Sequence, residues 1–283
     1  MPSNPTADRA AKAVALPAPW CDSAVTVVLP TYNEADNLPV IVRALLTLPL
    51  SGVRVLVVDD NSPDGTGAVA DALAEELNAD GPTRVSVVHR TVKEGLGRAY
   101  VDGMTRALDG GADFVVQMDA DLSHPPECIP EMLGTLHSTR ADLVIGSRYV
   151  TGGVLAEEWK LHRRLLSGWA NFYVQRLLSL RIRDVTAGFK LWRADTLRDL
   201  QLATVGSNGY SFQVEMNYRA VLRGHKVMEV PIRFEERRQG ASKMSLAVQL
   251  ESALMPLRLR RRRHELRPGR STQDGPLGEY PQN

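Results

Sequence analysis

The chain is organised around one stretch, Phe114-Val115-Val116-Gln117-Met118-Asp119-Ala120-Asp121. It predicts a buried apolar strand that ends in two carboxylates, one residue apart. Because successive side chains of an extended chain alternate between faces, Asp119 and Asp121 are expected to point the same way. Two carboxylates on one face can hold Mg²⁺ or Mn²⁺, and such an ion can bind a diphosphate. A strand-end turn with solvated aspartates fits the Asp-x-Asp pattern alone equally well.

The segments before this stretch alternate between strands and helices. Compact β-branched runs predict strands at 24–29, 53–58 and 84–89, and helical patterns predict helices at 66–78 and 96–109. This alternation favours parallel strands joined by right-handed helical crossovers, which is an α/β fold. Ligands bind such sheets at the carboxyl ends of the strands. One crevice is therefore expected to contain the polar clusters at 32–34, 59–60 and 119–121.

A dinucleotide is another ligand that such a crevice can bind. Its fingerprint, G-x-G-x-x-G, should follow the first strand directly. Here the first strand is followed by residues 30–34, Pro-Thr-Tyr-Asn-Glu, and the Gly95-Leu96-Gly97 segment lacks the third glycine. The pattern therefore disfavours a dehydrogenase.

Length and composition set the remaining bounds. The 283 residues suffice for one large α/β domain, and the net charge of +1 gives no global field that would attract nucleic acid. Cys21 and Cys128 form no CxxC pair, which favours a reduced, cytosolic setting. No apolar run approaches the roughly 18 residues of a membrane-spanning helix, so any contact with a membrane is expected from the side.

The expected domain organisation has four parts. They are a flexible tail at 1–22, a catalytic domain at 23–240, an amphipathic basic helical segment at 241–263 and a disordered tail at 264–283.

Six motifs in unbroken order carry a resemblance to a known family. They are VVLPTYNE at 27–34, VVDDNSPDGT at 57–66, MDADLSHPP at 118–126, GSRY at 146–149, DVTAGF at 184–189 and RRQGASKM at 237–244. Over about residues 24 to 250 the chain resembles the inverting glycosyltransferases of family 2, and more narrowly the polyprenol-phosphate (dolichol-phosphate) mannose synthases.

The resemblance implies a GT-A fold, with a Rossmann-like, mostly parallel sheet flanked by helices and C-terminal amphipathic helices. It also implies transfer of mannose from GDP-mannose to a polyprenyl phosphate, with Mg²⁺ or Mn²⁺ as the cofactor. No residue distinguishes guanine from uracil, so a UDP-sugar donor, as in a polyprenyl-phosphate glucosyltransferase, stays open. An alternative of another class is a catalytically silent nucleotide-sugar-binding subunit that recruits a membrane partner. The intact pair Asp119 and Asp121 opposes that alternative.

The resemblance also assigns residues to roles. Those expected to line the donor base and ribose are Pro30, Tyr32, Glu34, Val58 and Asp60. Those expected at the diphosphate and metal are Asp119, Ala120 and Asp121, with Ser123 where many members carry a glutamine ligand. The residues expected to bind the acceptor are Arg148, Arg163 and Ser167. The residues expected to be catalytic are Asp119, Asp121 and Arg148. The Ser123 hydroxyl is shorter than glutamine, so water could fill that position or the metal could bind more weakly.

Positive charge near the diphosphate is expected from Arg148, Arg237 and Lys243, because cations suit phosphate oxygens. A solvated basic loop is the alternative for Arg237 and Lys243. A lipid phosphate is already largely anionic near neutral pH, since its second pKa is about 6, and needs no general base. A sugar hydroxyl would need one, and Asp184 is the best candidate, although positioning a loop or an arginine is its favoured role. His124, beside two prolines, is expected to be structural.

Two segments point to a membrane surface. Residues 161–180 predict a helix whose apolar face contains Trp169, Phe172 and Tyr173, which fits either an interfacial helix or a core-packed one. The arginine run at 258–263 favours anionic lipid over nucleic acid, because no aromatic stacking platform accompanies it. The expected location is peripheral, on the cytosolic face of the membrane, with a separate anchoring subunit as a further possible partner.

Overall fold

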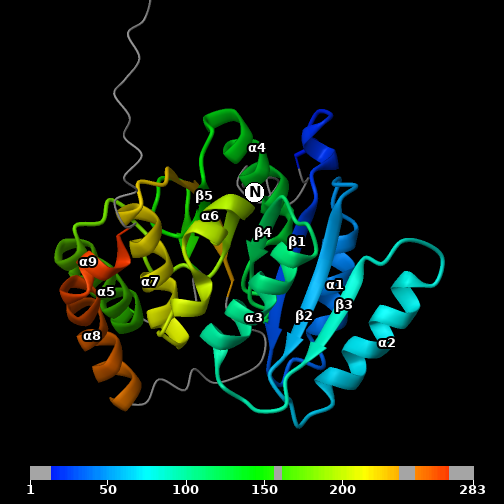
Figure 1. The fold of residues 1–283 in the computed structure, drawn as a ribbon, viewed down its shortest axis with the longest axis horizontal. Helices are drawn as coiled ribbons and strands as arrows, with labels where there is room; N and C mark the ends of the chain where they lie inside the picture. The colour runs from blue at the N-terminus through cyan, green and yellow to red at the C-terminus, as the bar shows by residue number, and fades with distance from the viewer. Residues whose placement is uncertain (1–13, 156–160, 236–245, 268–283) are drawn as a thin grey trace, which may run out of the picture.

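The computed structural model describes residues 14–155, 161–235 and 246–267. Its centre is a seven-stranded sheet in the order β3-β2-β1-β4-β7-β5-β8 (Figure 1). The strands are β1 (Val25–Thr31), β2 (Val53–Asp59), β3 (Val85–His89), β4 (Phe114–Gln117), β5 (Leu143–Ser147), β7 (Lys190–Arg193) and β8 (Val227–Pro231). A separate two-stranded ribbon pairs β6 (Val154–Leu155) with β9 (Arg233–Phe234). The predicted α/β fold with a mostly parallel sheet is confirmed.

Helices cover both faces of the sheet (Figure 1). One face carries α1 (Leu38–Leu46), α2 (Thr66–Asn78) and α4 (Ile129–Thr139). The other carries α3 (Leu96–Asp109), α5 (Leu161–Leu178), α6 (Ala194–Asp199), α7 (Gly209–Leu222), α8 (Leu246–Arg261) and α9 (Arg263–Leu266). Because the central strands are buried on both faces, they are continuous apolar runs rather than alternating ones. The predicted helices at 66–78 and 96–109 coincide with α2 and α3.

Strand β7 is the exception to the parallel arrangement. It lies between β4 and β5 and pairs antiparallel with both. Its first residue, Lys190, therefore stands opposite Gln117 near the end of β4 and opposite Ile145 of β5. The segment that leads into β7 consequently reaches the same sheet edge as the carboxyl ends of the parallel strands.

Helix α3 packs very closely on the sheet at Gly103. A Cβ atom at this position would lie 2.4 Å from Val28 Cγ1 and 2.9 Å from Val58 Cγ2. A glycine is therefore required for α3 to approach β1 and β2 this closely. The contact brings the N-terminal part of α3, with Tyr100, against the end of β4.

Three predicted boundaries need correction. The apolar stretch from Phe114 does not stay extended to Asp121, because β4 ends at Gln117 and the two aspartates lie in the following loop. The flexible tail predicted at 1–22 does not include Trp20, which stacks on His137 of α4 with ring centroids 5.0 Å apart, and its part at 1–13 lies outside the described residues. The disordered tail predicted at 264–283 does not include residues 264–266, because α9 continues to Leu266, which is buried in the core, and residues 268–283 lie outside the described residues.

The basic helix predicted at 241–263 corresponds in its described part to α8 and the start of α9. Among the helices that the structure describes, none combines the length and the apolarity needed to cross a bilayer.

Candidate active site

The site lies at the carboxyl edge of the sheet. Strands β1, β2, β4 and β5 end there at Thr31, Asp59, Gln117 and Ser147. The polar clusters at 32–34, 59–60 and 119–121 follow three of these strand ends, so the topology places them at one edge as the sequence predicts. Arg148 follows the fourth strand end.

The Asp119 carboxylate is held from helix α3. The Tyr100 hydroxyl donates to Asp119 Oδ1 over 2.6 Å, and Tyr100 itself is fully buried with its ring stacked on Phe212. Burial raises the pKa of Tyr100 well above its ordinary value, and the negative charge of Asp119 adds to this effect. Tyr100 therefore stays protonated and remains a donor across the working pH range. The main-chain N–H of Asp119 donates to His124 Nδ1 over 3.2 Å, and the structural role predicted for His124 stays a prediction.

The Asp121 carboxylate is held within its own loop. Asp121 Oδ1 accepts hydrogen bonds from the main-chain N–H of Ser123 at 3.1 Å and from the Ser123 hydroxyl at 2.5 Å. Both residues are buried. Ser123 therefore orients Asp121 in this structure, and its predicted role as a metal ligand stays a prediction.

The donor set suits a hard divalent cation that arrives with a phosphate ligand. Within the described part of the chain, no group of three or more His, Cys, Asp and Glu side chains is arranged to hold a metal by itself. Mg²⁺ is commonly held by one or two carboxylates together with substrate phosphates. Gly188 packs closely on Asp119, since a Cβ at this position would lie 3.2 Å from Asp119 Oδ2 and 3.2 Å from His124 Cε1, so a larger residue would crowd the carboxylate. The pair of carboxylates therefore fits Mg²⁺ or Mn²⁺ bound jointly with a diphosphate.

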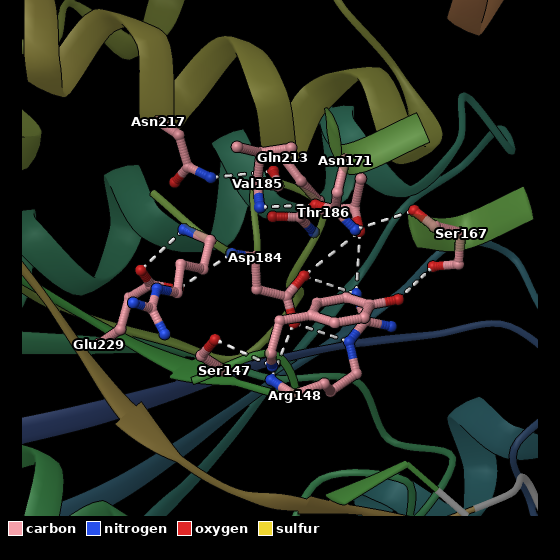
Figure 2. Close-up of polar contacts among 12 residues, drawn as sticks. Ser147, Arg148, Ser167, Asn171, Asp184, Val185, Thr186, Gln213, Asn217 and Glu229 are labelled. Carbon is pink, nitrogen blue, oxygen red and sulfur yellow. Dashed lines mark hydrogen bonds and ion pairs between the residues drawn. The ribbon is translucent and has the colours of Figure 1, made fainter. Parts of the chain in front are cut away.

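Arg148 forms a buried ion pair with Asp184. Its Nε donates to Asp184 Oδ2 over 2.8 Å and its Nη2 to Asp184 Oδ1 over 2.7 Å (Figure 2). The Arg148 main-chain N–H donates to the same carboxylate, and Nη2 also donates to Thr186 Oγ1. The two side chains are only 10% and 0% exposed. With both oxygens engaged by the guanidinium, Asp184 positions an arginine, the role that the sequence favours.

Lys190 is a fully buried cation at the same edge. Its Nζ donates to the main-chain oxygen of Gln213 at 3.2 Å and to Gln213 Oε1 at 2.8 Å. Burial lowers the pKa of Lys190 to about 7, although the charges of Asp184 and Asp119 oppose this shift. With a pKa near 7, Lys190 carries part of a positive charge at neutral pH, and this charge acts on the carboxylates of Asp184 and Asp119.

Of the residues predicted on the donor side, Arg237 and Lys243 lie outside the described residues and the others are described. Tyr32 is 37% exposed, and the Lys93 ammonium lies 3.2 Å from the centre of its ring. Glu34 accepts a hydrogen bond from Asn37 Nδ2 at 2.7 Å. Asp60 is buried and pairs with Arg90, and it also accepts the main-chain N–H groups of Glu94 and Gly95. Asp60 therefore fixes the loop before α3.

Three other predicted contacts with the donor and diphosphate are less accessible. The Val58 side chain is fully buried beneath Gly103 of α3, and the predicted place of Val58 beside the donor stays a prediction. A ligand at the strand ends could contact only its main chain. Pro30 and Ala120 are also buried, and their roles stay predictions.

On the acceptor side, the Ser167 hydroxyl accepts a hydrogen bond from Tyr149 Oη at 2.7 Å. Ser167 thus lies next to the residue that follows Arg148. Arg163 belongs to α5, but its side chain is outside the described residues. Arg237 and Lys243 also lie outside the described residues.

Comparison with known proteins agrees with this geometry. Residues 26–201 match the family described as Glycosyl transferase family 2. The chain belongs to this family. The resemblance inferred from the six motifs is therefore confirmed.

Curated relatives of this family 2 glycosyltransferase are similar along most of their length. The chain is 49% identical over 220 residues to a polyprenol monophosphomannose synthase of Mycolicibacterium smegmatis, covering 77% of this chain and 80% of that protein. It is 46% identical over 222 residues to an undecaprenyl-phosphate mannosyltransferase of Micrococcus luteus, covering 78% and 87%.

Solved structures share the fold at lower identity. A glucosyl-3-phosphoglycerate synthase from Mycobacterium tuberculosis, in complex with Mn²⁺, UDP and phosphoglyceric acid, aligns with a TM-score of 0.59 and 18% identity over 84% of this chain and 78% of that one. A mannosyltransferase from Pyrobaculum calidifontis, in complex with GDP-mannose and Mn²⁺, aligns with a TM-score of 0.55 and 17% identity over 88% and 66%. These likenesses establish the GT-A-like fold of the family 2 chain.

Several residues that shape the site are not apparent from the sequence. They are Arg90, Tyr100, Asn171, Lys190 and Glu229. Each lies in an ordinary strand or helix pattern, or beside one, and reaches the site only through tertiary contacts. A lysine within the apolar run Gly188-Phe189-Lys190-Leu191-Trp192 is the one signal that could have been noticed.

Proposed function

We propose that this protein transfers mannose from GDP-mannose to a polyprenyl monophosphate, with inversion, to give polyprenyl-phosphate mannose. The observation that carries the proposal is the identity of 46–49% to a polyprenol monophosphomannose synthase and an undecaprenyl-phosphate mannosyltransferase. The geometry of the carboxyl edge supports it, because the edge offers a carboxylate pair for a diphosphate-bound metal and a fixed arginine for a second anion.

Departure of the nucleoside diphosphate requires that its charge be stabilised. When bound, Mg²⁺ or Mn²⁺ supplies this as a Lewis acid. Asp119 and Asp121 are the residues that would hold it, and both are oriented in advance by Tyr100 and Ser123. Such orientation reduces the rearrangement needed during the reaction. Arg237 and Lys243 remain the predicted further cations at the diphosphate.

A phosphate acceptor explains why the site needs no separate base. The acceptor oxygen carries negative charge near neutral pH, because the second pKa of a phosphate monoester is about 6. The Arg148 guanidinium would bind that anion, and Asp184 fixes the direction in which it points. Arg163 and Ser167 are the proposed companions on α5.

A lipid acceptor calls for a membrane surface, and one end of the molecule offers side chains suited to it. Helices α5 and α8 pack together there (Figure 1). Trp169 and Phe172 of α5 are 60% and 61% exposed, and Leu254 and Leu257 of α8 are also exposed. The exposed arginines that follow them in α8, Arg258, Arg260 and Arg261, would attract anionic headgroups. We therefore propose peripheral attachment to the cytosolic membrane face, with a separate anchoring subunit as a further candidate partner.

Incubation with nucleotide sugars tests the proposal directly. Purified protein is given GDP-mannose, UDP-glucose or other nucleotide sugars, with Mn²⁺ or Mg²⁺ and a polyprenyl phosphate, and lipid-linked sugar is measured. Transfer from GDP-mannose is expected. Transfer only from a UDP-sugar would replace the donor, and binding of donor without any transfer would favour the silent subunit.

The Asp121→Ala variant is expected to lose metal-dependent transfer while it stays folded, because one of the two metal-binding carboxylates is gone. The matched control is Asp80→Ala, at an exposed position after α2, which should keep wild-type turnover. Full turnover in Asp121→Ala would remove the carboxylate pair from the mechanism.

A further inference from the structure

Helix α5 is joined to the Arg148 site by a buried amide. Asn171 is only 3% exposed, and both ends of its side chain are engaged. Its Nδ2 donates to the Ser167 main-chain oxygen over 3.1 Å, and its Oδ1 accepts the Val185 main-chain N–H over 2.9 Å (Figure 2). A buried amide costs free energy unless it is hydrogen-bonded, so these two bonds account for an asparagine at a core-facing helical position.

The main chain at Val185 is held from two sides. Its N–H is bound by Asn171 of α5, and its carbonyl oxygen accepts Asn217 Nδ2 of α7 over 3.0 Å. Just before it, Glu229 of β8 accepts the main-chain N–H groups of Arg183 at 2.8 Å and Asp184 at 2.9 Å (Figure 2). Side chains from three elements therefore set the position of this short segment.

This segment is the part of the chain that grips Arg148. Asp184 stands immediately before Val185 and Thr186 immediately after it, and both accept hydrogen bonds from the guanidinium. The placement of the Val185 main chain therefore fixes the spacing between two partners of Arg148. A shift of Val185 would turn the guanidinium.

Two further bonds join α5 to the same region. Gln175 Nε2 donates to the Arg183 main-chain oxygen over 2.9 Å, and Tyr149 Oη donates to Ser167 Oγ over 2.7 Å. Ser167, Asn171 and Gln175 follow one another at intervals of four residues, so they lie along one face of α5. That face binds the Arg148 site, whereas Trp169 and Phe172 of the same helix are exposed.

We propose that Asn171 is a positioning residue for the acceptor half of the reaction. It fixes the segment 184–186 to α5, and through this segment it sets the orientation of Arg148 toward the acceptor phosphate. The inference rests on the proposed function for the identity of that acceptor. It assigns Asn171 no contact with the donor nucleotide. The two carboxylates expected on the donor side, Asp119 and Asp121, are held by Tyr100 and Ser123 instead.

The test is a split between acceptor and donor kinetics in Asn171→Leu, which keeps the number and branching of the side-chain heavy atoms and removes both hydrogen bonds. Because a misplacement near 1 Å can cost up to about 100-fold in rate, we expect kcat/KM for polyprenyl phosphate to fall about tenfold or more at saturating GDP-mannose. The KM for GDP-mannose and the affinity for GDP with Mn²⁺, measured by calorimetry, should stay close to wild type.

A matched control exists where α2 packs on β3, the strand at the far edge of the sheet. Asn78 of α2 grips β3 in a similar way, since its Nδ2 donates to Val85 O at 2.8 Å and its Oδ1 accepts the N–H groups of Arg84 and Val85. Asn78→Leu removes comparable bonds from a place with no link to Arg148. It should lower stability without separating the two kinetic constants.

A second variant covers the case in which Asn171→Leu does not fold. Gln175→Leu changes a half-buried side chain and removes one bond between α5 and the loop, so a smaller loss in the same direction is expected. Unchanged acceptor kinetics in whichever of the two variants folds, or an equal loss for donor and acceptor, would overturn the role of Asn171. A wild-type enzyme inactive on every polyprenyl phosphate would instead overturn the proposed function on which the inference rests.

Discussion

Replacement of Asp184 by asparagine tests the buried ion pair that holds Arg148. Asparagine keeps the shape of the side chain but removes the charge and sets an amide group against the guanidinium. Because the pair is nearly inaccessible to water, Arg148 would keep a buried charge without its carboxylate partner. Removal of one partner from a buried pair costs about 3–5 kcal/mol of unfolding free energy.

The loss should be visible in both chemical and thermal unfolding. In a domain of roughly this size each kcal/mol corresponds to about 2–4 °C, so Asp184→Asn is expected to melt about 6–20 °C below wild type. Glu76→Gln provides a control, because the Arg43–Glu76 pair makes equally short contacts at 2.7 Å but both side chains are about half exposed. That variant should melt close to wild type, since water screens an exposed pair.

A double-mutant cycle separates the pair from general damage. Urea unfolding is measured for Asp184→Asn, Arg148→Gln and the combined variant. The combined variant should be more stable than the sum of the two single losses predicts, by at least about 1 kcal/mol, because the two side chains are in direct contact. Additive losses would refute the account of Arg148 and Asp184 as a coupled pair.

The same variant distinguishes positioning from base catalysis. If Asp184 only positions Arg148, Asp184→Asn lowers turnover while the pH–rate profile keeps its shape. Loss of the acidic limb of that profile would instead identify Asp184 as a general base.

Three further variants address Lys190, Tyr100 and the exposed face of α5. The pKa of Lys190 is about 7 in the folded protein, against an ordinary value of 10.5. Between pH 7 and 10.5 the unfolded chain therefore binds more protons than the folded one, and the free energy of unfolding of the wild type should rise with pH. The rise amounts to at most roughly 1.4 kcal/mol per pH unit. Urea unfolding of Lys190→Met, measured from pH 7 to 10, should show a flatter dependence on pH. Tyr100→Phe removes the hydrogen bond that orients Asp119 and should weaken Mn²⁺ binding in the presence of GDP by about tenfold or more, measured by calorimetry or electron paramagnetic resonance. The double variant Trp169→Ser/Phe172→Ser should bind anionic vesicles at least about tenfold more weakly in a sedimentation assay, because two exposed aromatic rings are lost.

Each of these variants has a control. Lys226→Met changes an exposed lysine and should leave the pH dependence unaltered, and Tyr218→Phe changes a buried tyrosine on α7 outside the carboxylate pair. Val92→Ser removes an exposed apolar side chain from the loop between β3 and α3. A slope retained in Lys190→Met, Mn²⁺ binding unchanged in Tyr100→Phe, or equal vesicle binding by the aromatic double variant and Val92→Ser would each contradict the reasoning.

The fold class and the place of the site follow from the order of the amino acids. Runs such as Val53–Asp59 record burial on both faces of a strand, and their alternation with helical patterns predicts a parallel sheet. Given such a sheet, polar residues that follow several strands must meet at one edge. The local pattern is therefore enough to place Asp119 and Asp121 at the same sheet edge as Asp59 and Asp60.

The side chains that support these carboxylates and Arg148 are set by tertiary packing alone. The antiparallel insertion of β7 puts Lys190 behind two carboxylates, α3 brings Tyr100 to Asp119, and α5 brings Asn171 to Val185. The physical reason is that a periodic pattern records whether a residue is buried but not what it faces. A hydrogen bond between distant segments depends on how the layers pack, and it leaves no mark in the local order of residues.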